Sequence, residues 1–368
     1  MTYRVIQWGT GSVGQAALSE ILTQTLFELV GVKVYDERKV GLDAARLCGP
    51  QCTDLPATGI LAVRETDALP LQDADCVIYC PMIADYDEIA RLLEAGVNVI
   101  TTASNVYPKF YGPEVFNKLE QAAIKGRASF HGSGINPAFM SDVLPLTLSG
   151  LSHRAQKISV REVSDVNHYA SSAPEIMLDH IGFGKPPAEA LEPGDFLKGM
   201  TAYFSESIAM ICDHLGVTLD RVEENHQVAT SRVRVVLENG RVIEPGTVGC
   251  RLFEWAGIVH GKPRILLSTF WKLTTDLEPQ WDVQTSDAVE WTVTVEGTPS
   301  FRCKVETCAS FDPENPDYGQ RGEQAALLAT ATHALNAIPA VCQAQPGIRT
   351  FLQLPIIASQ GAFRDFEK

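Results

Sequence analysis

Near its start the chain reads Gly9-Thr10-Gly11-Ser12-Val13-Gly14, a GxGxxG pattern between an apolar run, Tyr3–Trp8, and a segment of helical composition, Val13–Leu18. A lone GxGxxG is weak evidence, but one between a strand and a helix is typical of a dinucleotide-binding turn. In such a turn the first glycine permits the bend, the second lets a pyrophosphate approach, and the third allows the helix to pack on the strand. We therefore predict that these six residues bind a dinucleotide diphosphate at the N-terminus of the helix. An ordinary glycine-rich turn is the alternative.

Composition narrows the class of protein. A length of 368 residues favours two domains, and a formal net charge of −15 argues against nucleic acid or an anionic membrane as partner. The N-terminus lacks a basic region followed by an apolar stretch, and no run of about 18 apolar residues occurs, so we predict a cytoplasmic protein. The pairs Cys48/Cys52 and Cys76/Cys80 have no interleaved histidine, which favours buried free thiols over a metal site.

The first 142 residues alternate between predicted strands and helices. The strands are 29–35, 75–80, 97–101 and 128–131, and the helices after the first are 85–95 and 113–125. This alternation indicates parallel crossovers and an α/β fold, a Rossmann doubly wound parallel sheet. We assign residues 1–142 to a dinucleotide-binding domain.

The pattern changes in residues 143–317. A predicted strand at 158–167 and a long helix at 192–215 precede a β-rich region with strands at 232–237, 247–255, 264–271 and 290–296. We predict a second, α+β domain with an antiparallel or mixed sheet, which binds substrate and forms a homodimer through one sheet face. Residues 318–368, with a helix at 323–338, are predicted to return to the first domain.

Asp36 follows the second predicted strand, 22 residues after Gly14. A carboxylate at this place accepts hydrogen bonds from the adenosine ribose hydroxyls of NAD and repels the 2′-phosphate of NADP. Arg38 and Lys39 follow at once and are able to pair with that phosphate, so we predict NAD or NADP, with the carboxylate favouring NAD. The alternative is a plain turn.

Further cofactor-binding residues are predicted at the carboxyl ends of the later strands, where ligands bind in open parallel sheets. They are Cys80 and Pro81, Thr102, and Asn136. The segment containing Asn136 also leads into the second domain, and a plain interdomain turn is the alternative there.

Hydride transfer to a C=O or C=N group needs a proton donor or a polar partner. The densest polar cluster near the domain junction is 161–169, where strand alternation puts Glu162, Ser164 and His168 on one face and Tyr169 on the other. His168 and Tyr169 are our candidates, with a structural or surface role as the alternative. Trp271 is a candidate for the pocket wall or for core packing.

Several motifs resemble a known family. Val5–Gly14 resembles the start of dihydrodipicolinate-reductase-like proteins, Gly132-Ser133-Gly134-Ile135-Asn136-Pro137-Ala138-Phe139 resembles their G-x-G-x-N-P-G-F junction, and Ala334–Cys342 resembles the C-terminal end of actinobacterial members. The group that is most similar is the 2,4-diaminopentanoate dehydrogenase-like, NAD(P)-dependent amine dehydrogenases. This resemblance implies an oxidoreductase that transfers a hydride between NAD(P) and an amine, or a ketone plus ammonia, in a cleft between two domains. The low charge of the segments expected to line that cleft suggests a small, largely apolar ketone, imine or amine.

One expected residue is missing from the resemblance. Those amine dehydrogenases hold the amine with a glutamate after the fifth strand, whereas Ser104 or Asn105 stands at that place here. Neither side chain takes up a proton as a carboxylate does. We keep Ser104 and Asn105 as catalytic candidates beside His168 and Tyr169. An ammonia-independent carbonyl or enone reductase, or a non-catalytic dinucleotide-binding module, remains the alternative function.

Overall fold

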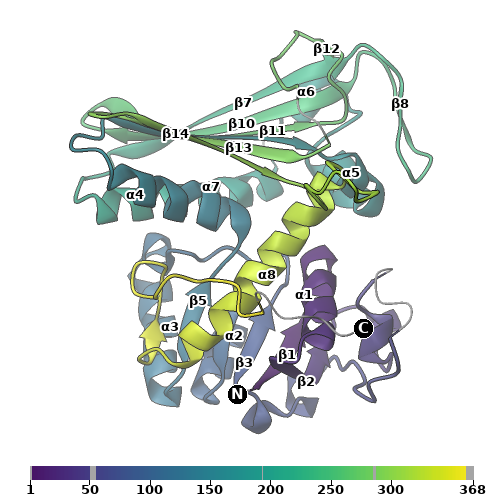
Figure 1. The fold of residues 1–368 in the computed structure, drawn as a ribbon, viewed down its shortest axis with the longest axis vertical. Helices are drawn as coiled ribbons and strands as arrows, with labels where there is room; N and C mark the ends of the chain where they lie inside the picture. The colour runs from purple at the N-terminus through teal and green to yellow at the C-terminus, as the bar shows by residue number, and fades with distance from the viewer. Residues whose placement is uncertain (1, 50–54, 193, 285–286, 362–368) are drawn as a thin grey trace. The chain divides into compact units, whose positions relative to one another are not determined.

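The computed structural model describes residues 2–49, 55–192, 194–284 and 287–361. The chain forms two compact units, the first comprising Met1–Ala138 with Leu327–Lys368 and the second comprising Phe139–Ala326 (Figure 1). Each unit has its own hydrophobic core.

Unit 1 contains a parallel sheet of six strands in the order β15-β5-β4-β3-β1-β2. Its strands are β1 (Tyr3–Trp8), β2 (Phe27–Lys33), β3 (Cys76–Tyr79), β4 (Asn98–Thr101), β5 (Ser129–Gly132) and β15 (Gly347–Ile348). Its helices are α1 (Ser12–Thr23), α2 (Tyr86–Glu94), α3 (Pro113–Gly126) and the unit 1 part of α8 (Gly322–Cys342). One core packs α1 and α8 on a sheet face, and a second core packs α2 and α3 on the opposite face. This arrangement confirms the predicted Rossmann doubly wound fold.

The strand order places the glycine-rich turn at the ligand-binding edge. From β1 the chain passes to β2 on one side, and the later strands β3, β4 and β5 follow on the other. The order therefore reverses between β1 and β3, and such a switch point is where doubly wound sheets bind their ligands.

Unit 2 is built on a mixed sheet of seven strands, in the order β12-β7-β10-β11-β6-β13-β14. Only β11 and β6 pair in parallel among these described strands. The strands are β6 (Lys157–Asp165), β7 (Arg221–Ser231), β10 (Val248–Val259), β11 (Lys262–Lys272), β12 (Leu277–Glu278), β13 (Val289–Glu296) and β14 (Phe301–Thr307), with a separate hairpin of β8 (Val235–Val236) and β9 (Val242–Ile243). The helices are α4 (Leu144–Ser149), α5 (Asn167–Ser172), α6 (Pro187–Ala190) and α7 (Asp195–His214). Figure 1 shows α4 and α7 along one face of this sheet.

The prediction that residues 158–167 form one strand, with alternation extending to His168 and Tyr169, was wrong at its end. Strand β6 ends at Asp165, and both candidates lie in helix α5. The Asp165 carboxylate accepts hydrogen bonds from the Asn167 backbone N–H at 3.2 Å and from its side-chain amide at 2.7 Å. This Asx turn leads the chain out of the sheet and into α5.

The predicted strand at 232–237 was also wrong in extent. Only Val235–Val236 is a strand there, in the β8–β9 hairpin. The long strand of this region is β7, Arg221–Ser231, which pairs with β10. Its first half is mostly charged or polar and exposed, so its sequence lacks a strand signal.

Among the described residues one helix, α8, has the length and apolar composition of a membrane span, with a mean hydropathy of 1.4 over 18 residues. Core helices of globular domains share this composition. Six of its residues belong to the core of unit 1, namely Ala331, Ala334, Leu335, Ala337, Ile338 and Val341. The part of α8 from Ala331 onward therefore packs into the core of unit 1.

Candidate active site

The glycine-rich turn has one open glycine between two tightly packed ones. A Cβ atom on Gly9 would lie 3.0 Å from the Cys80 carbonyl oxygen, and one on Gly14 would lie 2.2 Å from the Gly9 carbonyl oxygen. Gly9 also has a φ of +86°, which favours glycine. A Cβ on Gly11 would meet no atom within 4 Å. Packing thus explains the outer glycines, while the middle one leaves a bare stretch of backbone for a ligand.

Helix α1 begins at this open glycine. Gly11 is the N-cap, and the first helical bond runs from the Gln15 N–H to the Gly11 carbonyl at 2.8 Å. The N–H groups of Ser12, Val13 and Gly14 therefore precede the helical ladder, and no acidic side chain lies in the first turn. Such an end attracts phosphate, so the residues present fit the diphosphate of a dinucleotide.

A lysine adds positive charge to the turn. The Lys39 ammonium lies 2.8 Å from the Thr10 carbonyl oxygen and 3.1 Å from its hydroxyl. The sequence suggested Lys39 only as a partner of the 2′-phosphate of NADP, because no local pattern in the sequence indicates that Lys39 contacts Thr10. In the structure the Lys39 ammonium contacts the glycine-rich turn itself.

Asp36 lies just after β2 and holds Arg38. Its carboxylate accepts the Arg38 backbone N–H at 3.0 Å and the guanidinium at 2.8 Å. These hydrogen bonds lower the pKa of Asp36 to about 2. The group is therefore ionised at neutral pH, and the Arg38 guanidinium is held on the same carboxylate.

The residues Cys80, Pro81 and Thr102 lie together at the carboxyl ends of β3 and β4. The Cys80 N–H donates to the Trp8 carbonyl at 2.7 Å, and the Thr102 N–H donates to the Tyr79 carbonyl at 3.1 Å. A Cβ on Gly9 would lie 3.4 Å from the Pro81 nitrogen, so these residues border the glycine-rich turn. Burial raises the pKa of the Cys80 thiol, which is therefore neutral.

Ser104 and Asn105 lie in a loop after β4, both with positive φ, 58° and 65°. Both are buried. The Asn105 amide accepts a hydrogen bond from the Tyr86 hydroxyl at 2.9 Å and donates to the Ala103 carbonyl at 2.9 Å. These bonds tie the loop to α2. Asn136, the last candidate in unit 1, follows β5 in a segment with non-helical backbone angles.

His168 and Tyr169 belong to unit 2. The His168 Nδ1 atom lies 3.0 Å from a Glu238 carboxylate oxygen. The Tyr169 N–H donates to both carboxylate oxygens of Glu323 at 3.1 Å, and burial raises the pKa of the Tyr169 phenol. Sequence reasoning missed Glu323, which lies 154 residues away in the chain.

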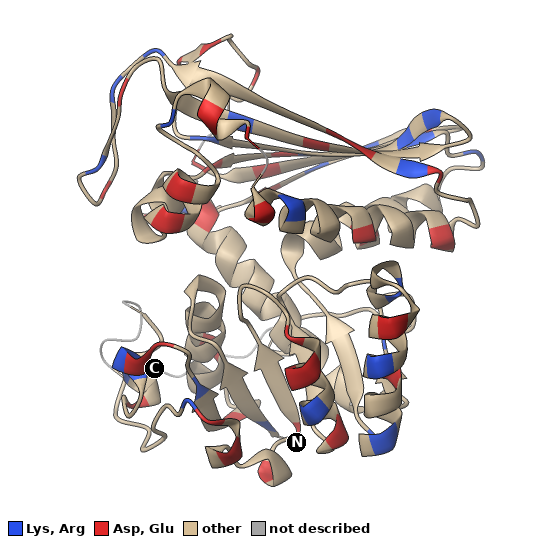
Figure 2. Cartoon of the chain, turned by 180° about the vertical axis from the view of Figure 1, so that it is seen from behind, with Lys and Arg blue, Asp and Glu red and all other residues tan. Residues whose placement is uncertain are grey.

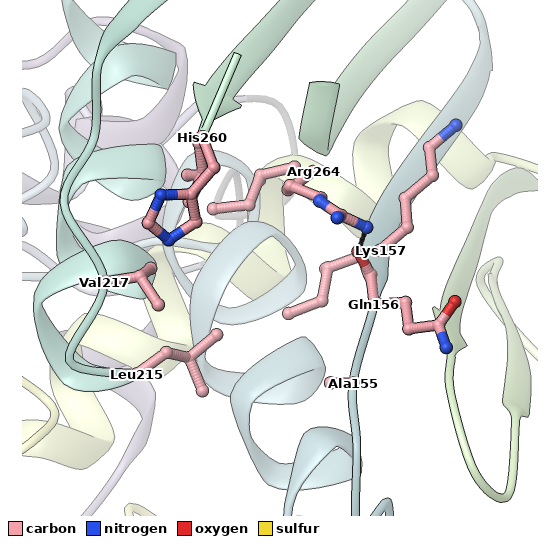
Figure 3. A pocket seen from close by; sticks show the side chains of 10 residues that line it. Ala155, Gln156, Lys157, Leu215, Val217, His260 and Arg264 are labelled. Atoms are coloured by element: carbon pink, nitrogen blue, oxygen red, sulfur yellow. Dashed lines mark hydrogen bonds between the residues drawn. The ribbon is translucent and has the colours of Figure 1, made fainter. Parts of the chain in front are cut away.

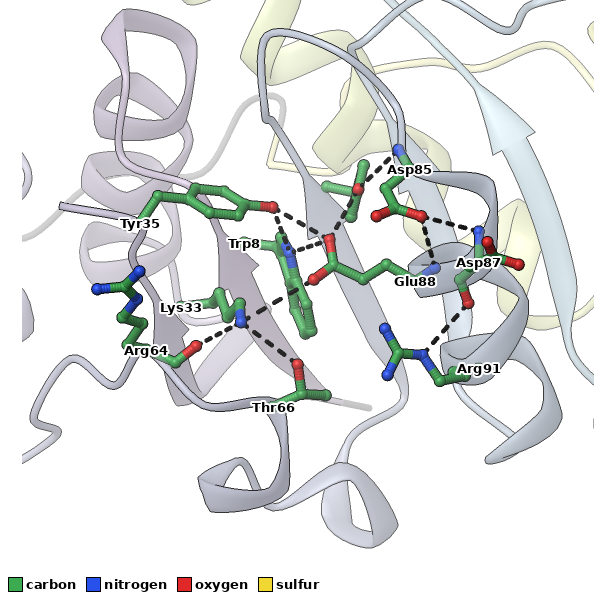
Figure 4. A network of polar contacts seen from close by, with 10 residues as sticks. Trp8, Lys33, Tyr35, Arg64, Thr66, Asp85, Asp87, Glu88 and Arg91 are labelled. Carbon is green, nitrogen blue, oxygen red and sulfur yellow. Dashed lines mark hydrogen bonds and ion pairs between the residues drawn. The ribbon is translucent and has the colours of Figure 1, made fainter.

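A largely buried polar network at the carboxyl ends of β1, β2 and β3 was also missed (Figure 4). One Glu88 carboxylate oxygen accepts the Trp8 indole N–H at 3.0 Å and the Tyr35 and Tyr79 hydroxyls at 3.1 and 2.8 Å. Lys33 lies 3.9 Å from the other oxygen. Burial, followed by the Glu88 charge, raises the pKa of Tyr35 to about 12, so that phenol stays neutral. The network joins the ends of β1, β2 and β3 to helix α2.

A pocket of about 240 Å³ lies in unit 2 next to the turn between β10 and β11, at one end of the sheet (Figure 3). Leu215, Val217 and Ile158 contribute apolar side chains to its lining, and His260 and Arg264 contribute polar ones. None of the predicted site residues lines it.

Within the described residues no group of three or more His, Cys, Asp and Glu side chains is placed to hold a metal ion. Cys52 lies outside the described residues.

The parallel sheet, its switch point and the glycine-rich turn define a dinucleotide-binding dehydrogenase of the Rossmann class. The family model for the 2,4-diaminopentanoate dehydrogenase C-terminal domain matches residues 139–368, and the chain belongs to this family. The family confirms the predicted resemblance.

Two relatives match along nearly their whole length. An amine dehydrogenase of Streptomyces virginiae is 29% identical over 364 residues, covering 95% of this chain and 96% of that protein. A 2,4-diaminopentanoate dehydrogenase of Acetoanaerobium sticklandii is 25% identical over 382 residues, covering 98% and 96%. Among solved structures, an amine dehydrogenase from Mycobacterium smegmatis has the same fold, with a TM-score of 0.72, 20% identity and 98% coverage of each chain.

Proposed function

We propose that this protein is an NAD(P)-dependent oxidoreductase of the amine dehydrogenase type. It transfers a hydride between the nicotinamide and a small, largely apolar amine, imine or ketone. Family membership supports the reaction class. The single structural observation that carries the proposal is the open backbone at Gly11, between two glycines that packing requires.

The chain's own residues have separate tasks in this proposal. The turn from Gly9 to Gly14 binds the diphosphate, with Lys39 adding positive charge. Cys80, Pro81, Thr102 and Asn136 flank the ribose and nicotinamide. The bound cofactor supplies or accepts the hydride.

NAD is the favoured dinucleotide in our proposal. The ionised Asp36 carboxylate suits ribose hydroxyls and repels a 2′-phosphate. Its bonds to Arg38 also occupy the cation that would otherwise pair with that phosphate.

An ammonia-independent carbonyl or enone reductase is the second candidate. The observation that favours it is the loop after β4, where Ser104 and Asn105 replace the glutamate of the amine dehydrogenases. The Asn105 side chain is also bonded to Tyr86 and Ala103, which gives it a structural task in the loop. Either reductase would use polar groups such as His168 or Tyr169 near the reacting heteroatom.

A screen with and without ammonium tests the two functions. Aldehydes, ketones and enones are incubated with NADH or NADPH, and cofactor oxidation is followed at 340 nm. Ammonium-dependent oxidation supports the amine dehydrogenase, and ammonium-independent oxidation selects the reductase. Binding of either dinucleotide without turnover of any substrate would select a non-catalytic binding module, and no binding of either would overturn both enzymes.

We further propose a cytoplasmic homodimer that acts on a small molecule. The cysteines described in the structure are free thiols, in keeping with a reducing compartment. Figure 2 shows lysine and arginine positions interspersed with aspartate and glutamate positions on the helices of unit 1. Two ion pairs between α2 and α3 are Lys118–Asp87 and Lys125–Glu94. Such mixed charge does not suit a phosphate backbone.

A further inference from the structure

We infer that the pocket of unit 2 next to the β10–β11 turn binds a small carboxylate with an apolar chain. The inference goes beyond the proposed function, because every residue that lines this pocket belongs to unit 2 and none is a predicted site residue. It stands on the volume of the pocket, its apolar lining and two basic side chains on opposite sides of it.

The walls of the pocket are parts of the fold that neighbouring contacts hold in place. Val217 follows the C-terminus of α7, and Ile158 and Ile265 are directly paired near the starts of β6 and β11. The Asp220 carboxylate accepts the Gly261 N–H at 2.8 Å, which ties the segment after α7 to the β10–β11 turn. The walls are therefore largely ordered before a ligand arrives, so binding costs little conformational freedom.

Two basic side chains lie on opposite sides of this pocket. Figure 3 shows His260 on the same side as Leu215, with Arg264 across from them. His260 and Gly261 have φ values of +52° and +69°, as a two-residue hairpin turn requires, so the turn fixes the position of the imidazole. The Arg264 guanidinium is held from below its strand, since one of its N–H groups donates to the Gln156 carbonyl at 2.9 Å.

The lining is basic although the protein is acidic overall. The whole chain has a formal net charge of −15, yet the described lining contains Lys157, His260 and Arg264 and no aspartate or glutamate. Within the described part of the chain Arg264 forms no ion pair, and its bond to a neutral carbonyl leaves further guanidinium N–H groups for a ligand. Figure 3 shows the Lys157 side chain extending away from the pocket, so we assign the anionic group of the ligand to Arg264 and His260.

These features favour a carboxylate that carries an apolar chain. A guanidinium matches the two oxygens of a carboxylate, and Ile158, Val217 and Ile265 offer an aliphatic chain apolar contacts. Inorganic phosphate has no apolar part for these walls, and a neutral hydrocarbon has no group for Arg264. The volume of about 240 Å³ exceeds the roughly 150 Å³ in which a benzene molecule fits, so a short branched-chain carboxylate is of suitable size.

The test measures the binding of 4-methylpentanoate to the full chain by ligand-observed NMR titration at pH 7, without dinucleotide. We expect Arg264→Gln to weaken this binding by at least about 10-fold (about 1.4 kcal/mol). Arg264→Lys, which keeps the charge but not the planar fork, should weaken it less. The uncharged 4-methylpentanamide should bind the wild type more weakly than the carboxylate does. The matched control is Arg302→Gln, which removes an exposed arginine of β14 outside the pocket lining and should leave the affinity unchanged.

Each outcome decides the inference. Equal affinity of the wild type and Arg264→Gln, equal affinity for carboxylate and amide, or an equal loss in Arg302→Gln overturns the site, as does tighter binding of inorganic phosphate. If circular dichroism shows that Arg264→Gln does not fold, Leu215→Glu at the exposed wall replaces it. A several-fold weaker affinity in that variant supports the site, and an unchanged affinity overturns it. No dinucleotide takes part, so these results are independent of the proposed function.

Discussion

The half-buried carboxyl of Glu323 should make the stability of this protein fall as the pH rises from about 5 to 8. Burial, with the nearby charges of Asp165 and Glu238, raises the pKa of Glu323 from 4.5 to about 8, although the Tyr169 N–H opposes this shift. Between these pH values the unfolded chain has released the proton while the folded chain retains it. Folding then requires proton uptake, so the free energy of unfolding decreases with pH across this window.

The size of the effect follows from the shift. A difference of about 3.5 units at about 1.36 kcal/mol per unit sets an upper limit of roughly 5 kcal/mol. Water reaches the half-buried carboxyl and screens part of this penalty, so we expect about 2 kcal/mol. Glu323→Gln has no charge to gain, and its amide oxygen still accepts a hydrogen bond from Tyr169. The variant should therefore become more stable relative to the wild type as the pH rises.

The assay is urea unfolding followed by circular dichroism at pH 5, 6, 7 and 8. The difference in free energy of unfolding between Glu323→Gln and the wild type should grow by about 2 kcal/mol in favour of the variant over this range. Glu175→Gln removes an exposed glutamate of the same unit and serves as the charge control. Parallel stability curves for Glu323→Gln and the wild type would refute the reasoning.

Three further substitutions test the proposed dinucleotide binding by unit 1 and the stability of the Glu88 network. Gly14→Ala should raise the dissociation constant of NADH, measured by fluorescence titration, by more than about 10-fold (about 1.4 kcal/mol), because its Cβ would lie 2.2 Å from a backbone carbonyl in the turn. The control is Gly199→Ala, where a Cβ meets nothing within 4 Å, and this variant should leave the dissociation constant unchanged. Asp36→Ser should free Arg38 and shift the kcat/KM ratio towards NADPH by about 10-fold in steady-state kinetics, and an unshifted ratio would place cofactor selection elsewhere. Glu88→Ala leaves the buried Trp8 and Tyr79 donors without their acceptor and should cost about 2–4 kcal/mol in thermal unfolding. A loss below about 0.5 kcal/mol would contradict the network.

The glycine-rich turn was predictable because its requirements are local. The spacing of Gly9, Gly11 and Gly14 specifies which positions lack room for a Cβ and which one leaves the backbone open. Alternating strands and helices then indicated the parallel sheet, and the family confirms both the fold class and the kind of protein. No comparable local pattern marks Lys39, whose place on the turn depends on the path of the chain after β2.

Strand ends and polar strands were harder to predict. Alternation in 158–167 continues past Asp165 in the sequence, but an Asx turn at Asp165 follows the end of the strand and leads into α5. Strand β7 was missed because its exposed polar residues carry no β signal of their own; its pairing with β10 defines it. In both cases a specific partner, and not the intrinsic preference of the segment, decides the structure.

The hydrogen bonds of Glu162 could not be predicted from the sequence, because they depend on how distant strands pair. Alternation correctly puts Glu162 and Ser164 on one face of a strand, and Trp271 was a candidate for a pocket wall. The chain separates Glu162 from its two indoles by 109 and 129 residues, so only the register of β6 with β11 and β13 makes them neighbours. A slip of one residue in either pairing would move an indole to the opposite face of the sheet. This hydrogen-bonded cluster is therefore a property of strand register, which no motif in this sequence encodes.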